Sequence, residues 1–301
     1  MDSAQSPRGR HSAASTRSGA GLGSVLVGLI GAGIQSSRMP ALHQAEGAAQ
    51  GLQYVYKLID LTELALDAAA LPELLTAARR FGFAGLNITH PCKQAVVPLL
   101  DALSEEARII GAVNTVVFAE DGRATGHNTD VSGFAESFRR GLPDVARERV
   151  VQLGAGGAGS AVAHALLGLG IKRLELIDTD RARAEHLAGE LRRRFGAARA
   201  TVAERTDRAV AGADGVVNAT PIGMAKYPGA PIPLTLLRPD LWVVEIIYFP
   251  METELLRAAR ARGCRSMGGG GMAVFQAVDA FRLFTGIEPD AERMLDHFER
   301  L

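Results

Sequence analysis

One glycine-rich stretch constrains the fold of this chain more than any other feature. Residues 150–166 read VVQLGAGGAGSAVAHAL, a β-prone run followed by a turn and then by the apolar pattern of a helix. The glycines Gly154, Gly156 and Gly159 have the spacing Gly-x-Gly-x-x-Gly, and Gly157 lies in the same turn. The first glycine permits a tight turn, the second a close approach of backbone to a ligand, and the third close packing of the helix.

The start of this predicted helix is suited to bind phosphate, because its first N–H groups have no partner within the helix. Since the motif directly follows a predicted strand and opens a predicted helix, it indicates a Rossmann unit that binds a dinucleotide. All four glycines would then belong to the cofactor site. The alternative is a glycine-rich turn that binds no ligand.

Asp178 ends the next β-prone run and indicates which dinucleotide binds. A carboxylate at this offset hydrogen-bonds the ribose hydroxyls of NAD, and it would repel the 2′-phosphate of NADP. Arg181 and Arg183 lie close enough in sequence to offer that phosphate a partner. Asp178 could instead begin the following helix. We expect NAD, with NADP less favoured.

β-prone runs and helical patterns alternate along the chain, which predicts parallel sheets and the α/β class. In the first part the runs cover residues 24–33, 52–61 and 83–89, with helical patterns at 39–51 and 71–82. The pair Asp121-Gly122 indicates a hairpin between two further runs. We expect two domains: a first unit at 25–130 and a Rossmann domain at 148–265, with C-terminal helices at 272–301 that complete the first unit.

Charge and composition argue against several classes of partner. Lys plus Arg (33) equals Asp plus Glu (33), so no net field attracts nucleic acid or an anionic membrane. No stretch is long and apolar enough to span a bilayer, and Cys92 and Cys264 have no second ligand at metal-binding spacing. We expect a cytoplasmic monomer or homodimer that binds a small molecule and no metal. Residues 1–24 are expected to be a flexible tail, with an organelle transit sequence as the alternative.

Short polar residues gather where the predicted elements of the first unit end. The set consists of Asn87, Thr89, Lys93, Asn114 and Asp130. Ligands of α/β proteins bind at the carboxyl ends of strands, so these side chains are placed to hydrogen-bond a hydroxylated molecule. Two plainer interpretations stay open: Asp130 could be the N-cap of the helix that follows it, and Lys93 could form a solvated ion pair.

An ordered series of motifs resembles the shikimate dehydrogenase family, and within it most closely the NAD-using quinate/shikimate dehydrogenases. The match runs from about residue 25 to residue 290. Its motifs are SRMPALH (37–43), NITHPCK (87–93), GAVNTVV (111–117), GHNTD (126–130), GAGGAG (154–159), NATPIGM (218–224), YFPMET (248–253) and MAVFQAVDAF (272–281). A series of this length is far more specific than a shared Rossmann unit.

The resemblance implies a role for each matching residue. The first unit would be the substrate domain, and Lys93 and Asp130 match the catalytic pair of the family. The positions that match those holding the carboxylate and hydroxyls of the substrate or lining its pocket are Ser37, Asn87, Thr89, Asn114, Tyr248 and Gln276. The positions that match the loop beside the nicotinamide are Asn218, Thr220 and Met224.

The implied reaction is the reversible, NAD-dependent oxidation of shikimate or quinate to the 3-dehydro acid. A nicotinamide would accept the hydride. Lys93, positioned by Asp130, would accept the hydroxyl proton and return it in the reverse direction. Two alternatives are a dehydrogenase of a related cyclic polyol acid, such as an amino analogue, and a regulatory protein that binds NAD without turnover. Retention of both Lys93 and Asp130 favours an enzyme.

The sequence departs from the family pattern at two positions. Met39 replaces a second Ser or Thr that follows Ser37 by two residues, and a thioether cannot donate a hydrogen bond to a carboxylate. Glu245 stands where the family usually has Asp, one methylene shorter. We expect the change at 245 to be tolerated, whereas the change at 39 bears on carboxylate recognition.

Restoring a hydroxyl at position 39 tests this interpretation. Met39→Ser or Met39→Thr is expected to tighten the binding of carboxylated substrates several-fold, because a hydroxyl can donate a hydrogen bond to the carboxylate. The measurement is the KM or Kd for shikimate. If the affinity does not improve, Met39 does not face the carboxylate.

Overall fold

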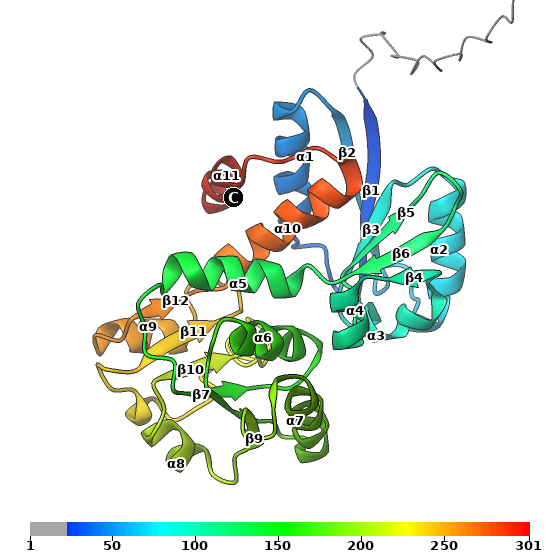
Figure 1. The fold of residues 1–301 in the computed structure, drawn as a ribbon. Coiled ribbons are helices and arrows are strands. Elements are labelled where there is room, and N and C mark those ends of the chain that lie inside the picture. The colour runs from blue at the N-terminus through cyan, green and yellow to red at the C-terminus, as the bar shows by residue number, and fades with distance from the viewer. Residues whose placement is uncertain (1–22) are drawn as a thin grey trace, which may run out of the picture.

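The computed structural model describes residues 23–301, so nearly all of the expected tail at 1–24 lies outside the described residues. Two six-stranded sheets form the two halves of the molecule, and each sheet is covered by helices. Two long helices, α5 (Asp130–Gly141) and α10 (Gly270–Thr285), pack against each other between the halves (Figure 1). The expected α/β class with two sheet domains is confirmed.

The first sheet is mixed, so the prediction of a parallel sheet is only partly right. Its strands are β1 (Ser24–Gly31), β2 (Gln53–Asp60), β3 (Gly85–Ile88), β4 (Ala102–Leu103), β5 (Thr115–Phe118) and β6 (Ala124–His127), in the order β2-β1-β3-β5-β6-β4. β1 pairs in parallel with β2 and β3, but β5 is antiparallel to β3 and β6. The hairpin predicted at Asp121-Gly122 is confirmed, with Gly122 at φ +83°. A hairpin returns the chain without a crossover helix, and therefore forces the antiparallel pairing.

Helices cover both faces of the first sheet. They are α1 (Met39–Ala49), α2 (Leu71–Arg80), α3 (Cys92–Ala95) and α4 (Glu105–Ile110), with short 3-10 helices η1 (Ala68–Ala70) and η2 (Val97–Leu99). Side chains of β1 alternate between two apolar clusters. Val27 and Leu29 pack with residues of α1 and α10, whereas Ile30 packs on the other face with residues of α2 and α3.

The second sheet is entirely parallel and has the strand order of a Rossmann domain. Its strands are β7 (Arg149–Leu153), β8 (Arg173–Ile177), β9 (Ala200–Val202), β10 (Gly215–Asn218), β11 (Trp242–Glu245) and β12 (Ser266–Met267), in the order β12-β11-β10-β7-β8-β9. Its helices are α6 (Gly157–Gly168), α7 (Arg181–Phe195), α8 (Thr206–Ala211), η3 (Leu234–Leu236) and α9 (Glu254–Ala261). The winding reverses between β7 and β10, where doubly wound sheets bind ligands.

The C-terminal helices return to the first half. α10 packs against β1, α1 and β5, and α11 (Ala291–Arg300) packs against α1. The carboxylate of Glu46, which is 1% exposed, accepts two hydrogen bonds from the guanidinium of Arg293, at 2.7 and 2.8 Å. This ion pair, buried only on the side of Glu46, joins α11 to α1. Within residues 23–301, no helix combines the length and the apolar character needed to cross a membrane.

Candidate active site

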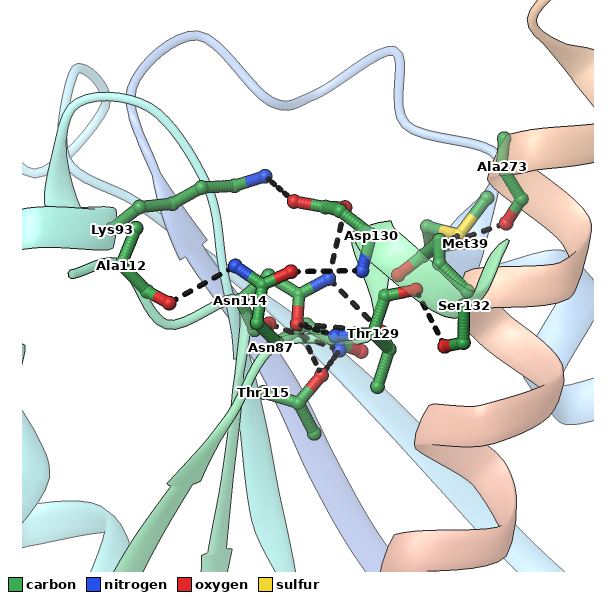
Figure 2. Close-up of polar contacts among 12 residues, drawn as sticks. Met39, Asn87, Lys93, Ala112, Asn114, Thr115, Thr129, Asp130, Ser132 and Ala273 are labelled. Carbon is green, nitrogen blue, oxygen red and sulfur yellow. Dashed lines mark hydrogen bonds and ion pairs between the residues drawn. The ribbon is translucent and has the colours of Figure 1, made fainter. Parts of the chain in front are cut away.

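Lys93 and Asp130 meet at the carboxyl ends of the strands in the first sheet. Lys93 lies in α3, just after β3, and Asp130 is the first residue of α5. The ammonium Nζ of Lys93 donates to Oδ2 of Asp130 at 2.6 Å, and Figure 2 shows the two side chains pointing toward each other. The lysine side chain is 20% exposed and the aspartate 8%. The ammonium therefore stays accessible, while the carboxylate is shielded.

The alternative interpretation of Asp130 as an N-cap does not hold. The cap position of α5 belongs to Thr129, and the Asp130 carboxylate accepts no hydrogen bond from an amide of that helix. Its Oδ1 instead accepts from the side-chain amide of Asn114 at 2.9 Å. The N–H of Asp130 is itself bonded, at 3.1 Å, to Oδ1 of Asn128. Tertiary donors on both sides thus orient the carboxylate away from the helix amides.

Asn114 connects this pair to the chain around it. Besides Asp130, its side-chain N–H group donates to Oγ1 of Thr129 at 2.9 Å, and its carbonyl accepts from the amide of Thr129 at 2.8 Å. Asn87 lies beside it and donates to Oγ1 of Thr115 at 3.1 Å (Figure 2). All of these side chains are buried. The network fixes the positions of the polar groups before any ligand is bound.

The remaining predicted substrate positions of the first half lie on several elements. Ser37 precedes α1, and its Oγ accepts from the amide of Met39 at 3.3 Å. Thr89 follows β3 and is half-buried. Gln276 on α10 donates to the carbonyl of Ala273 at 3.0 Å, and the same amide lies 3.3 Å from Sδ of Met39. The side chain that departs from the family pattern therefore contacts another predicted substrate position.

Tyr248 belongs to the segment that follows β11 in the second half, and its side chain is 36% exposed. Loss of solvent around the phenol and the negative charge of Asp130 raise the pKa of Tyr248. Its ring also packs edge-on against Phe298 of α11, with centroids 6.3 Å apart. The charge of a carboxylate in the first half thus acts on a residue of the second half.

The glycine turn after β7 has the properties that a dinucleotide site needs. Gly154 has φ +95°, and a Cβ at this position would lie 2.6 Å from the carbonyl of Ala219. A Cβ at Gly159 would lie 2.3 Å from the carbonyl of Gly154. A Cβ at Gly156 or Gly157 would meet no described atom within 4 Å. The surface above the start of α6 is therefore open, and the first amides of this helix are available to a pyrophosphate.

Asp178 follows β8 and faces the glycine turn. Its Oδ2 accepts from the amide of Ala155 at 2.7 Å, and its Oδ1 accepts from the amide of Asp180 at 2.8 Å. Asp180, not Asp178, caps α7, since its carboxylate accepts from the amide of Arg183 at 3.2 Å. The guanidinium of Arg183 lies 3.5 Å from Asp178. These residues fit NAD(P), because a carboxylate and an arginine lie beside the glycine turn, where the ribose of a bound dinucleotide would lie.

Asn218 and Glu245 shape the loop that carries Thr220 and Met224. Asn218 is fully buried, and its amide donates to both carboxylate oxygens of Glu245 at 3.0 and 2.9 Å. Its carbonyl accepts from the amide and the hydroxyl of Thr220. Met224, at the far end of the loop, is exposed. Asn218 therefore supports the loop from below.

Glu245 is held by hydrogen bonds, and no ion pair to it forms among residues 23–301. It accepts from the amide of Ile247 and the hydroxyl of Thr253, both at 3.1 Å. Burial raises the pKa of Glu245 to about 7, and the hydrogen bonds from Asn218, Ile247 and Thr253 offset only part of this effect. The side chain of Glu245, longer by one methylene than the Asp usual in the family, thus accepts four hydrogen bonds.

The raised pKa of Glu245 predicts a pH dependence of stability. The native state binds this proton more tightly than the unfolded chain, so the stabilisation is complete below the unfolded value of 4.5 and is lost as the pH rises through about 7. Between about pH 5 and pH 8, the free energy of unfolding should fall, relative to Glu245→Gln, by on the order of 2 kcal/mol. Urea unfolding of both proteins measures this difference, and parallel pH curves would contradict it.

Comparisons with known proteins agree with the fold and the motifs. Family models described as "Shikimate dehydrogenase substrate binding domain", "ThiF family" and "Shikimate 5'-dehydrogenase C-terminal domain" match residues 29–116, 127–220 and 269–297. The chain is 61% identical over 274 residues to a shikimate dehydrogenase (NADP(+)) of Streptomyces avermitilis, covering 90% of this chain and 94% of the relative. It is 54% identical over 273 residues to a quinate/shikimate dehydrogenase (NAD(+)) of Corynebacterium efficiens, covering 90% and 96%.

A solved structure extends the comparison to three dimensions. The quinate dehydrogenase of Corynebacterium glutamicum in complex with NAD superposes with a TM-score of 0.86 at 51% identity, covering 92% of this chain and 99% of that one. Sequence identity of this level over nearly the whole length exceeds what a shared Rossmann domain alone would give. The chain belongs to the shikimate dehydrogenase family.

Proposed function

We propose that this protein reversibly oxidises shikimate or quinate to the corresponding 3-dehydro acid, with a nicotinamide dinucleotide as the hydride acceptor. The observation that carries the proposal is the Lys93–Asp130 pair, at 2.6 Å, among polar side chains at the strand ends of the first sheet. The names of the relatives, which include both shikimate and quinate dehydrogenases, support the same reaction. The first half, with α10 and α11, binds the substrate, and the second half binds the cofactor.

Lys93 is the acid-base group in this proposal. A bound nicotinamide ring supplies the acceptor for the hydride. As the hydroxyl of the substrate loses its proton, the neutral amine of Lys93 accepts it, and the resulting ammonium is stabilised by the carboxylate of Asp130. In the reverse direction the ammonium returns the proton to the carbonyl oxygen. The bond from Asn114 to Oδ1 leaves Oδ2 of Asp130 directed at Lys93.

The other matching side chains hold the substrate. The carboxylate and the hydroxyls would be held by Ser37, Asn87, Thr89, Asn114 and Gln276, and Tyr248 would line the same pocket. Support comes from the exposure of these groups: Ser37, Thr89 and Gln276 are each half-buried and have capacity for a ligand. Met39 puts a thioether where the family has a hydroxyl donor, and this thioether contacts Gln276. The change favours a second candidate substrate, a related cyclic acid such as an aminated analogue.

The cofactor is NAD in preference to NADP. The carboxylate of Asp178, fixed by two backbone amides, suits the two ribose hydroxyls of NAD and disfavours a 2′-phosphate. Arg183 could offset part of this repulsion of the 2′-phosphate. Among the relatives, the one from Streptomyces avermitilis is named for NADP(+) and the one from Corynebacterium efficiens for NAD(+). The free, buried thiols of Cys92 and Cys264 suit a reducing cytoplasm, where we propose that the enzyme acts as a monomer or a homodimer.

A cofactor and substrate panel tests the proposal. Shikimate, quinate and an aminated analogue are each incubated with NAD⁺ or NADP⁺, and formation of the reduced cofactor is followed by absorbance. We expect turnover of shikimate or quinate, with a higher kcat/KM for NAD⁺ than for NADP⁺. A protein that binds NAD⁺ but turns over none of the three acids would contradict the proposed reaction, and a preference for NADP⁺ would contradict the cofactor assignment.

Truncation of Lys93 tests the assigned acid-base group. Lys93→Ala is expected to lower kcat by about 10²-fold or more, because the group proposed to take the proton is removed, while the Kd for NAD⁺ stays largely unchanged. Lys57→Ala is the matched control, since Lys57 is an exposed lysine of the same sheet. Unchanged turnover in Lys93→Ala would remove this residue from the mechanism.

A further inference from the structure

We propose that Gln152, buried beneath the glycine turn, is a positioning residue that orients both Asp178 and the start of α6 for the cofactor. The inference rests on the proposed binding of NAD at this turn and deepens it. Gln152 lies on β7, two residues before Gly154, and is fully buried.

The side-chain amide of Gln152 bridges the two ends of the turn. Its Nε2 donates to the carbonyl of Gly154 and to the carbonyl of Gly159, both at 2.8 Å. Both partners are acceptors only, so the orientation of the amide group is unambiguous. The two hydrogen bonds close the segment from Gly154 to Gly159 into a ring. One side chain thus fixes where the turn begins and where the first turn of α6 lies.

The bond to Gly154 also acts on Asp178 through one peptide group. A trans peptide is planar, so its C=O and its N–H point in opposite directions. When Gln152 holds the carbonyl of Gly154, the N–H of Ala155 is directed to the other side, where it donates to Oδ2 of Asp178 at 2.7 Å. The orientation of the carboxylate proposed to bind the ribose therefore depends on the glutamine below.

The bond to Gly159 acts on the phosphate-binding end. Gly159 lies in the first turn of α6, whose free amides are proposed to contact the pyrophosphate. An added Cβ on Gly156 or Gly157 would meet no described atom within 4 Å, so within residues 23–301 no side chain covers these two glycines. The turn is accordingly held from beneath, by Gln152, and is open where a ligand would lie.

The side-chain carbonyl of Gln152 indicates that packing alone does not explain a glutamine at this position. Oε1 of Gln152 is buried and has no hydrogen-bond partner among residues 23–301. A buried acceptor without a partner costs stability, whereas an apolar side chain would carry no such cost. The neighbouring strand residues Val150, Val151 and Leu153 are all apolar. The two donated hydrogen bonds are what an apolar residue could not supply.

The inference is tested by measuring cofactor binding in the Gln152→Met variant. The methionine side chain is similar in length to that of glutamine but donates no hydrogen bond. The Kd values for NAD⁺ and NADP⁺ are measured by titration calorimetry, together with the Tm. We expect the Kd for NAD⁺ to rise about tenfold or more. The Kd for NADP⁺ divided by the Kd for NAD⁺ should fall toward one, because Asp178 loses its fixed orientation. The KM for shikimate at saturating NAD⁺ should stay near that of the unaltered protein.

Two further variants separate positioning from stability. Val151→Ala, on the same strand and equally buried but with no hydrogen bond to the turn, is the control for a loss of packing. Gln152→Leu, which also donates no hydrogen bond and brings no ionisable group into the core, is judged by the same criteria if Gln152→Met does not fold. The inference is overturned if the folded Gln152 variant binds NAD⁺ within twofold of the unaltered protein, or if Val151→Ala changes the Kd ratio equally. If the unaltered protein binds neither dinucleotide, the proposed function fails instead.

Discussion

The carboxylate of Asp130 receives one hydrogen bond at each oxygen, from Lys93 at Oδ2 and from Asn114 at Oδ1, and the geometry of the site depends on this pair of contacts. A buried carboxylate is costly unless it is paired and hydrogen-bonded, so the loss of either donor would lower the stability of the fold. They come from different parts of the chain, one after β3 and the other just before β5. The same contacts that satisfy the buried charge therefore also set the position of the amine.

Asp130 is also the first residue of the helix that leads from the first sheet toward the second. α5 packs against α10, which returns to the first sheet, and so the two halves meet along this pair of helices. From the other side, the segment after β11 brings Tyr248 against Phe298 of α11, and Glu245 anchors the start of that segment. Because Glu245 also holds Asn218, one buried carboxylate supports both the loop with Met224 and the segment with Tyr248.

Much of this arrangement could be predicted from the sequence, because it follows from local spacing. The turn at Gly154 and the close packing at Gly159 are dictated by backbone geometry, and the spacing of the glycines is enough to recognise them. The motifs around Lys93 and Asp130 are distinctive, and the contact between the two side chains agrees with the pairing that the resemblance implied. The antiparallel pairing of β5 was missed, since the alternation of strands and helices does not give the order of strands in a sheet.

What the sequence did not reveal are contacts between residues far apart in the chain. The N-cap interpretation of Asp130 failed because the choice between a helix amide and a tertiary donor depends on where Asn114 and Lys93 lie in space. The hydrogen bonds of Thr115 and Gln152 could not be predicted, because both residues lie within β-prone runs whose pattern indicates only a buried strand. Met39 was recognised as a departure, but its contact with Gln276, 237 positions away, appears only in three dimensions.

The most direct test of the central claim is a crystal structure of the protein with NAD⁺ and shikimate bound. The account predicts that the reacting hydroxyl lies roughly 2.6–3.2 Å from Nζ of Lys93, with its carbon facing the nicotinamide ring. A substrate that binds with this hydroxyl out of reach of both Lys93 and Asp130 would contradict it.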